Sequence, residues 1–101
     1  ELFRRQMHGG GCVVAVEFAG GLDGARAVFD RLELIARAAS LGGVESLATL
    51  PAFTTHAQLS AEERARAGIP DGLMRIAVGL EGADHLLADL RQAMCALDRA
   101  R

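Results

Sequence analysis

Residues 12–18, with the sequence CVVAVEF, constrain the fold of this chain more than any other stretch. The run is apolar and rich in β-branched residues, and glycines bound it on both sides, at Gly9–Gly11 and Gly20–Gly21. These features are typical of a β-strand, because branched side chains pack well on a pleated sheet. A second apolar run, Leu73–Val78, predicts another strand late in the chain. A sheet built from these strands needs helices to bury its apolar face.

Three segments have the sequence pattern of helices. The first is predicted to begin with Asp23 as its N-cap and to fade before Ser40, with an apolar face made of Val28, Phe29, Leu32, Ile35 and Ala36. A short one is predicted to open at the capping box Ser60–Glu63 and to end at Gly68, before Pro70. The last has Asp84 near its positive end and an apolar stripe made of Ala83, Leu86, Leu87, Leu90, Met94 and Leu97.

The order of these segments predicts the fold class. It reads strand, helix, irregular segment or short strand, short helix, strand, helix. This order favours an α/β (α+β) fold, a two-layer sandwich in which a mainly antiparallel sheet carries helices on one face. With 101 residues, the chain is expected to form a single domain, residues 1–101, with one modest core.

Composition excludes several classes of function. The net charge of −2 gives no basic surface for nucleic acid, and the longest apolar run is far too short to span a membrane. Cys12 and Cys95 lie inside apolar patterns, which predicts reduced core thiols in a cytosolic protein. The chain begins at Glu1 without a signal peptide or an initiating methionine, so we expect it to be either a trimmed protein or a piece of something longer. All eleven basic residues are arginine, so the chain has no lysine.

No complete catalytic or metal-binding motif is present. His8, His56 and His85 are scattered and none has a partner at metal-site spacing, so we expect no metal ligands. The run His8–Gly11 is similar to the oxyanion loop of esterases, but no serine stands in the Gly-x-Ser-x-Gly pattern that such an enzyme needs.

Arg75 and Ser40 each have two interpretations. Arg75 interrupts an apolar strand, and is either a residue of the solvent face or a rigidly held guanidinium that binds a carboxylate. Ser40 is either a turn residue before Gly42–Gly43 or a hydroxyl presented where the backbone comes close to a ligand.

Three segments read together resemble a known family. In their order and spacing they are similar to the C-terminal domain of the Cys/Met metabolism PLP-dependent enzymes, a family that includes cystathionine γ-synthase, cystathionine γ- and β-lyases, methionine γ-lyase and O-acylhomoserine sulfhydrylases. The resemblance extends from Gly9 to about Leu97, and the segments are SLGGVESL, LPAFTTH and EERARAGIPDGLMRIAVGLE.

The resemblance implies a fold and a substrate site. The fold would be the small C-terminal domain of fold-type I PLP enzymes. Arg75 would form the salt bridge to the α-carboxylate of an amino-acid substrate, Ser40 would contact the same carboxylate region, and Thr55 would line the pocket. Ala39, directly before that serine, stands where substrate choice is partly decided. A small apolar residue there, as in methionine γ-lyases and several sulfhydrylases, argues mildly against a dedicated cystathionine enzyme. Together with the similarity of EERARAGIPDGLMRIAVGLE to the methionine γ-lyase pattern, it slightly favours methionine γ-lyase.

The resemblance also implies what this chain lacks. The lysine that carries pyridoxal 5'-phosphate, and the other residues that hold this cofactor, belong to a larger preceding domain. We therefore expect no catalytic and no cofactor-binding residue within the chain, and no activity from these 101 residues alone. A chain without lysine supports this view independently, because PLP needs a lysine amine.

The implied parent is a cytoplasmic PLP-dependent lyase or transferase of trans-sulfuration, in cysteine and methionine metabolism. Its partners would be the amino-acid substrate, the large domain of the same chain and further copies in a homotetramer. The sequence leaves open whether the reaction is γ-elimination, β-elimination or γ-replacement. The alternative is an autonomous, non-catalytic α/β module that binds a small carboxylate ligand or a protein partner.

Overall fold

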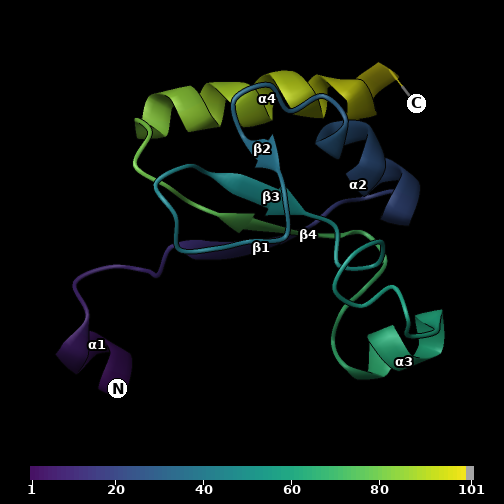
Figure 1. Ribbon diagram of the computed structural model, residues 1–101, viewed down its shortest axis with the longest axis horizontal. Coiled ribbons are helices and arrows are strands. Elements are labelled where there is room, and N and C mark those ends of the chain that lie inside the picture. Colours follow the sequence, from purple (N-terminus) through teal and green to yellow (C-terminus); the bar gives the residue numbers. More distant parts are fainter. Residues whose placement is uncertain (100–101) are drawn as a thin grey trace.

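The computed structural model describes residues 1–99 and is built around a four-stranded sheet (Figure 1). The spatial order is β1-β4-β3-β2, with β1 at Val13–Glu17, β2 at Ala36–Arg37, β3 at Leu47–Thr49 and β4 at Leu73–Ala77. β4 pairs antiparallel with β1 and with β3, and only β2 and β3 are parallel. The predicted strands and the mainly antiparallel sheet are thus confirmed.

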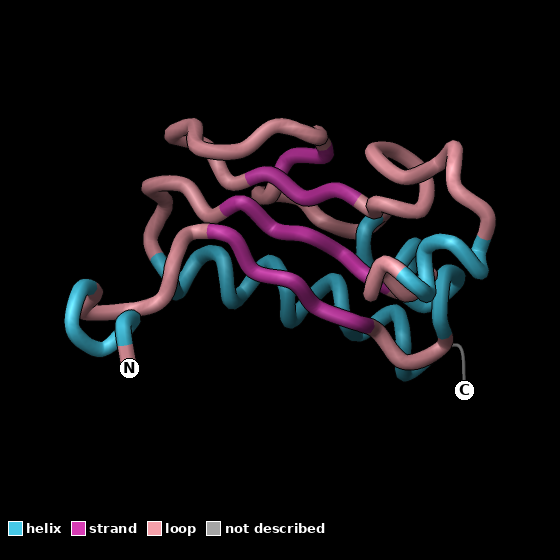
Figure 2. Tube along the Cα trace, turned by 90° about the horizontal axis from the view of Figure 1, so that it is seen from below, coloured by secondary structure: helices cyan, strands magenta, loops and turns pink. Residues whose placement is uncertain are grey.

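Two helices, α2 (Gly21–Phe29) and α4 (Ala83–Arg99), lie on one face of the sheet. Seen from below, the strands lie in front of α4 (Figure 2), so the predicted two-layer arrangement is confirmed. Met74 and Ile76 of β4 are buried in the core with residues of α2 and α4, among them Val28 and Ala93. Because side chains alternate along a strand, Arg75 belongs to the opposite face. The short helices α1 (Leu2–Gln6), which was not predicted, and α3 (Ala61–Arg66) lie away from this layer.

The extent of α2 differs from the prediction. The helix begins at Gly21, after Gly20 with a φ of 90°, and Asp23 lies inside the first turn rather than at the N-cap. It ends at Phe29, so Leu32 and Ile35 are buried but not helical, and Ala36 belongs to β2. After Phe29, the amides of Arg31 and Leu32 bond to carbonyls three residues back, and the helix does not resume because the amides of residues 33–35 bind the carboxylate of Asp89.

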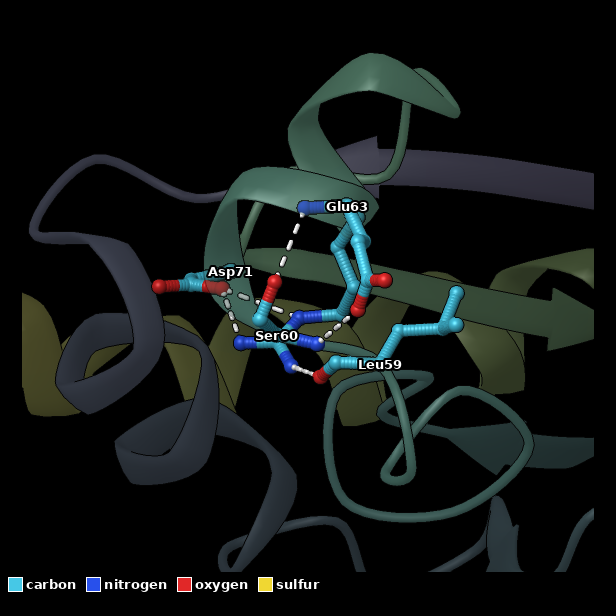
Figure 3. A network of polar contacts seen from close by, with 5 residues as sticks. Leu59, Ser60, Glu63 and Asp71 are labelled. Atoms are coloured by element: carbon cyan, nitrogen blue, oxygen red, sulfur yellow. Dashed lines mark hydrogen bonds and ion pairs between the residues drawn. The ribbon is translucent and has the colours of Figure 1, made fainter.

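The termini of α3 are as predicted. Ser60 and Glu63 form a reciprocal capping box, visible in Figure 3. Gly68 adopts a φ of 74°, and the N–H of Ile69 donates to the carbonyl of Arg64, as in a Schellman C-cap. The Arg64 guanidinium also donates to the carbonyl of Leu59 and to the carboxylate of Asp71. These contacts fix the chain segments that precede and follow α3.

The buried face of α4 is rotated relative to the predicted stripe. Leu86 is buried, but Leu87 and Met94 are each 46% exposed, and the buried face also contains Asp89 and Ala93.

The cysteines were predicted to be core thiols, and this is wrong. Both are free but exposed, because Cys12 precedes β1 and Cys95 lies on the outer side of α4. Among the helices of residues 1–99, none has the length and apolar character needed to cross a membrane.

Candidate functional site

Arg75 lies near the centre of the sheet, on the face opposite to the helices. Its register partners are Ala15 on β1 and Thr49 on β3. Because β4 pairs with a strand on each side, the backbone of Arg75 is held in place, and so is the Cα atom that carries its side chain.

The guanidinium of Arg75 is held by two backbone carbonyls. Nη2 donates to the carbonyl oxygen of Ala39 at 2.8 Å and to that of Ser40 at 3.1 Å. Nε of Arg75 is buried and has no hydrogen-bond partner among residues 1–99. A buried donor without a partner costs about 1–3 kcal/mol, so an acceptor from a ligand would be stabilised here. A guanidinium with a free Nε–H is suited to an anion such as a carboxylate.

Ala39 and Ser40 belong to an exposed segment that includes β2 and its connection to β3. Residues 36–45 are all exposed, and Gly42 adopts a φ of 79°. The segment becomes buried at Ser46, where the chain enters β3. We call residues 36–45 the exposed segment.

A carboxylate fixes the end of the exposed segment. Glu81 accepts hydrogen bonds from the backbone N–H and the hydroxyl of Ser46, each at 2.7 Å. The hydroxyl oxygen of Ser46 in turn accepts from the N–H of Gly79 at 2.8 Å. The backbone N–H of Ser46, and then its hydroxyl, lower the pKa of Glu81, so this side chain is a carboxylate at neutral pH.

Gly79 allows this close contact between two backbones. A Cβ atom at this position would overlap the backbone of Val44, Glu45 and Ser46. The glycine is therefore required for the approach of the strand end to the exposed segment.

A second carboxylate fixes the start of the exposed segment. Asp89 is buried in α4 and accepts from the N–H groups of Glu33, Leu34 and Ile35 at 2.9, 2.9 and 2.8 Å. Burial raises the pKa of Asp89, but these amides and the Gln92 side chain lower it by more, so the pKa lies below its ordinary value. Asp89 therefore holds the chain directly before β2.

The structure brings together three of the four predicted site residues. Ala39, Ser40 and Arg75 are in hydrogen-bond contact, although Ser40 contributes its carbonyl and not its hydroxyl. Thr55 is exposed and its hydroxyl lies 2.7 Å from Nδ1 of His56; no hydrogen bond joins it to the other three in the described chain.

Sequence reasoning missed Ser46, Glu81 and Asp89. Asp89 had a detectable signal, since it interrupts an apolar helical stripe three residues after Leu86. Glu81 had none, because an acidic residue in a glycine-flanked turn is ordinarily solvated.

A separate cavity of about 240 Å³ lies between α2 and the turn after β3. It is lined by Arg26, Phe29, Asp30, Leu50, Phe53 and Thr54. None of the predicted site residues lines it. No group of three or more potential metal ligands occurs among residues 1–99.

Comparison with known proteins gives the family. The model of the family described as "Cys/Met metabolism PLP-dependent enzyme" matches residues 1–95. The chain is 48% identical over 94 residues to a cystathionine gamma-lyase of Dictyostelium discoideum, with 93% of this chain and 24% of that protein covered. It is 48% identical over 93 residues to an L-methionine gamma-lyase of Pseudomonas putida, with 92% and 23% covered.

A solved structure agrees in fold. It is cystathionine gamma synthase from Xanthomonas oryzae pv. oryzae in complex with cystathionine, with a TM-score of 0.86 and 45% identity over 99% of this chain and 26% of that chain. The chain thus spans about a quarter of the length of the relatives it matches. Because the family model matches residues 1–95, nearly the whole chain, this chain belongs to the Cys/Met metabolism PLP-dependent enzymes.

Proposed function

We propose that residues 1–101 are the C-terminal substrate-recognition domain of a longer PLP-dependent enzyme that acts on sulfur amino acids. The observation that carries the proposal is Arg75, whose Nη2 is held by two carbonyls while its buried Nε has no partner among residues 1–99. A substrate α-carboxylate would accept from Nε. The hydroxyls of Ser40 and Thr55 would complete the polar side of the pocket.

The residues present do not fit attachment of the cofactor. A chain whose basic residues are all arginine offers no amine for PLP, so the cofactor would be held elsewhere in the longer enzyme. The role that this chain can supply is to bind and orient the substrate's carboxylate end.

Within the family's reactions, we place methionine γ-elimination first. Ala39 next to the site offers neither a charge nor a hydrogen-bonding side chain to the far end of a substrate. A substrate whose far end is an uncharged thioether, such as methionine, therefore suits this site better than cystathionine. The far end of cystathionine carries an ammonium and a carboxylate, which would lack partners near Ala39.

We extend the proposal to a cytoplasmic homotetramer. Two free, exposed cysteines suit a reducing compartment. Size-exclusion chromatography with light scattering of the full-length protein tests the tetramer directly.

Exposed apolar residues favour a domain of a longer protein over an autonomous module. Leu80 is 82% and Val44 is 67% exposed, and they are neighbours, since the N–H of Leu80 donates to the carbonyl of Val44 at 2.8 Å. Such surface is ordinarily covered by another domain or subunit. The isolated chain should bind a hydrophobic dye more strongly, per mole, than the full-length enzyme; equal binding would favour the autonomous module.

The kinetic test is Arg75→Ala in the full-length, PLP-loaded enzyme. Loss of a charge-assisted pair to the carboxylate should raise KM for the amino acid by about 30- to 300-fold. Arg66→Ala is the matched control, because Arg66 is exposed on α3 and has only an (i, i+4) surface ion pair. An unchanged KM in the Arg75→Ala enzyme would remove Arg75 from the site.

A further inference from the structure

The exposed segment carries Ala39 and Ser40 but has little packing of its own. Residues 36–45 are exposed, whereas the residues that flank the segment, Ile35 and Ser46, are buried. An exposed connection of this length is ordinarily mobile. Its position therefore depends on what holds its ends.

Backbone hydrogen bonds hold the segment where β2 pairs with β3 and where the N–H of Leu80 donates to the carbonyl of Val44. Side chains from one continuous part of the chain hold it at three further points. Asp89 binds the amides of residues 33–35 at the start, Arg75 binds the carbonyls of Ala39 and Ser40 in the middle, and Glu81 binds Ser46 at the end. All three side chains come from β4, α4 and the short turn that joins them.

The three contacts have different consequences. Asp89 is buried and its loss would affect folding. Glu81 is half-buried in the short turn before α4, and its carboxylate accepts from both the backbone N–H and the hydroxyl of Ser46. Glu81 is connected to Arg75 through the exposed segment, because Ser46 directly follows this segment and the carbonyls of Ala39 and Ser40 within it bind the Arg75 guanidinium.

We propose that Glu81 is a positioning residue for carboxylate binding. By fixing Ser46 against Gly79, it sets the position of the Ala39 and Ser40 carbonyls, and these hold Nη2 of Arg75 so that Nε points to the ligand. The proposal rests on the proposed function, because it assumes that Arg75 binds the substrate carboxylate.

Glu81→Gln in the full-length, PLP-loaded enzyme tests this role. The amide retains one acceptor for the Ser46 N–H but leaves the hydroxyl proton of Ser46 without its carboxylate partner. KM for the amino acid should rise about three- to tenfold with kcat within about twofold, because orientation of a binding group is lost. Glu62→Gln, on the exposed face of α3, is the matched control and should leave KM unchanged.

Two further measurements separate positioning from a general loss of stability. In the Arg75→Ala background, Glu81→Gln should change KM by less than about twofold, since its effect passes through Arg75. Hydrogen exchange of the amides of residues 40–46 should be faster in Glu81→Gln, while the amides of β4 stay as protected as before. Ser46→Ala removes the same contact from the other side and should reproduce the KM effect if Glu81→Gln fails to fold.

The outcomes are distinct. If Arg75→Ala raises KM and Glu81→Gln does not, the positioning role of Glu81 is overturned and the proposed function stands. Additive effects of the two substitutions would likewise overturn it. If Arg75→Ala leaves KM unchanged, the proposed function fails and the positioning role fails with it.

Discussion

The carboxylate of Asp89 accepts a 2.8 Å hydrogen bond from the backbone N–H of Ile35, which lies 54 residues earlier in the chain. This contact, with its two neighbours at Glu33 and Leu34, joins α4 to the turn that leads into β2. It keeps residues 33–35 out of a helix and directs the chain into β2, shortly before Ala39 and Ser40.

Asp89→Ala should destabilise the full-length protein by roughly 3 kcal/mol, because one buried and two partly buried amides lose a charged acceptor. Asp89→Asn should cost less, since one oxygen remains to accept from Leu34 and Ile35. Urea unfolding measures both. Asp98→Ala, at an exposed position of the same helix, should stay within about 0.5 kcal/mol. Equal stability of Asp89→Ala and Asp98→Ala would mean that the amides of residues 33–35 do not need this carboxylate.

Stability should fall in acid because the pKa values of Asp89 and Glu81 are lowered in the folded state. For an acid with a lowered folded pKa, the stabilisation is complete above the ordinary pKa and is lost as the pH falls through the folded value. The ordinary values are 3.8 for the aspartate and 4.5 for the glutamate. Urea midpoints measured from neutral pH to about pH 3 should therefore drop most steeply in the last one to two pH units. The drop should be smaller in Asp89→Asn and Glu81→Gln; an identical profile in both variants would contradict the assignment.

Gly79→Ala should weaken both folding and substrate binding. The added methyl overlaps the backbone of Val44 to Ser46, so the exposed segment must move away from the strand end. We expect a loss of stability of about 1–3 kcal/mol and a higher KM. Gly10→Ala is the control, since a Cβ there meets no atom within 4 Å. A Gly79→Ala enzyme with the stability and KM of this control would show that the two backbones can separate freely.

Ala39→Glu should change substrate preference. A carboxylate beside the site offers a partner to the far ammonium of cystathionine and none to methionine. The ratio of kcat/KM for methionine to that for cystathionine should exceed one in the unmodified enzyme and fall about tenfold or more in the variant. Steady-state kinetics with both substrates measures it. A ratio that does not change would show that residue 39 takes no part in the choice.

The sequence predicted those elements whose signals are local. β1 and β4 were evident from β-branched runs, and the capping box at Ser60 and the left-handed Gly68 gave α3 its termini. Alternation along β4 also placed Arg75 on the face away from Met74 and Ile76.

Contacts between distant residues decided the rest. Leu32 and Ile35 have helical spacing and are buried, yet they are not helical, because the amides near them bind Asp89 from another helix. The two hydrogen bonds between Ser46 and Glu81 join residues 35 positions apart, and no local sequence pattern around either residue predicts them. For the same reason, the carbonyls that hold Arg75 could not be read from sequence.

In the proposed site, Nε of Arg75 binds the substrate's α-carboxylate. The most direct measurement is a crystal structure of the full-length enzyme with a bound amino-acid substrate or an unreactive analogue. We predict a carboxylate oxygen at about 2.7–3.2 Å from Nε, with Nη2 still bound to the carbonyls of Ala39 and Ser40. A carboxylate bound elsewhere, with Nε of Arg75 occupied by another group of the protein, would show that Arg75 does not bind the substrate.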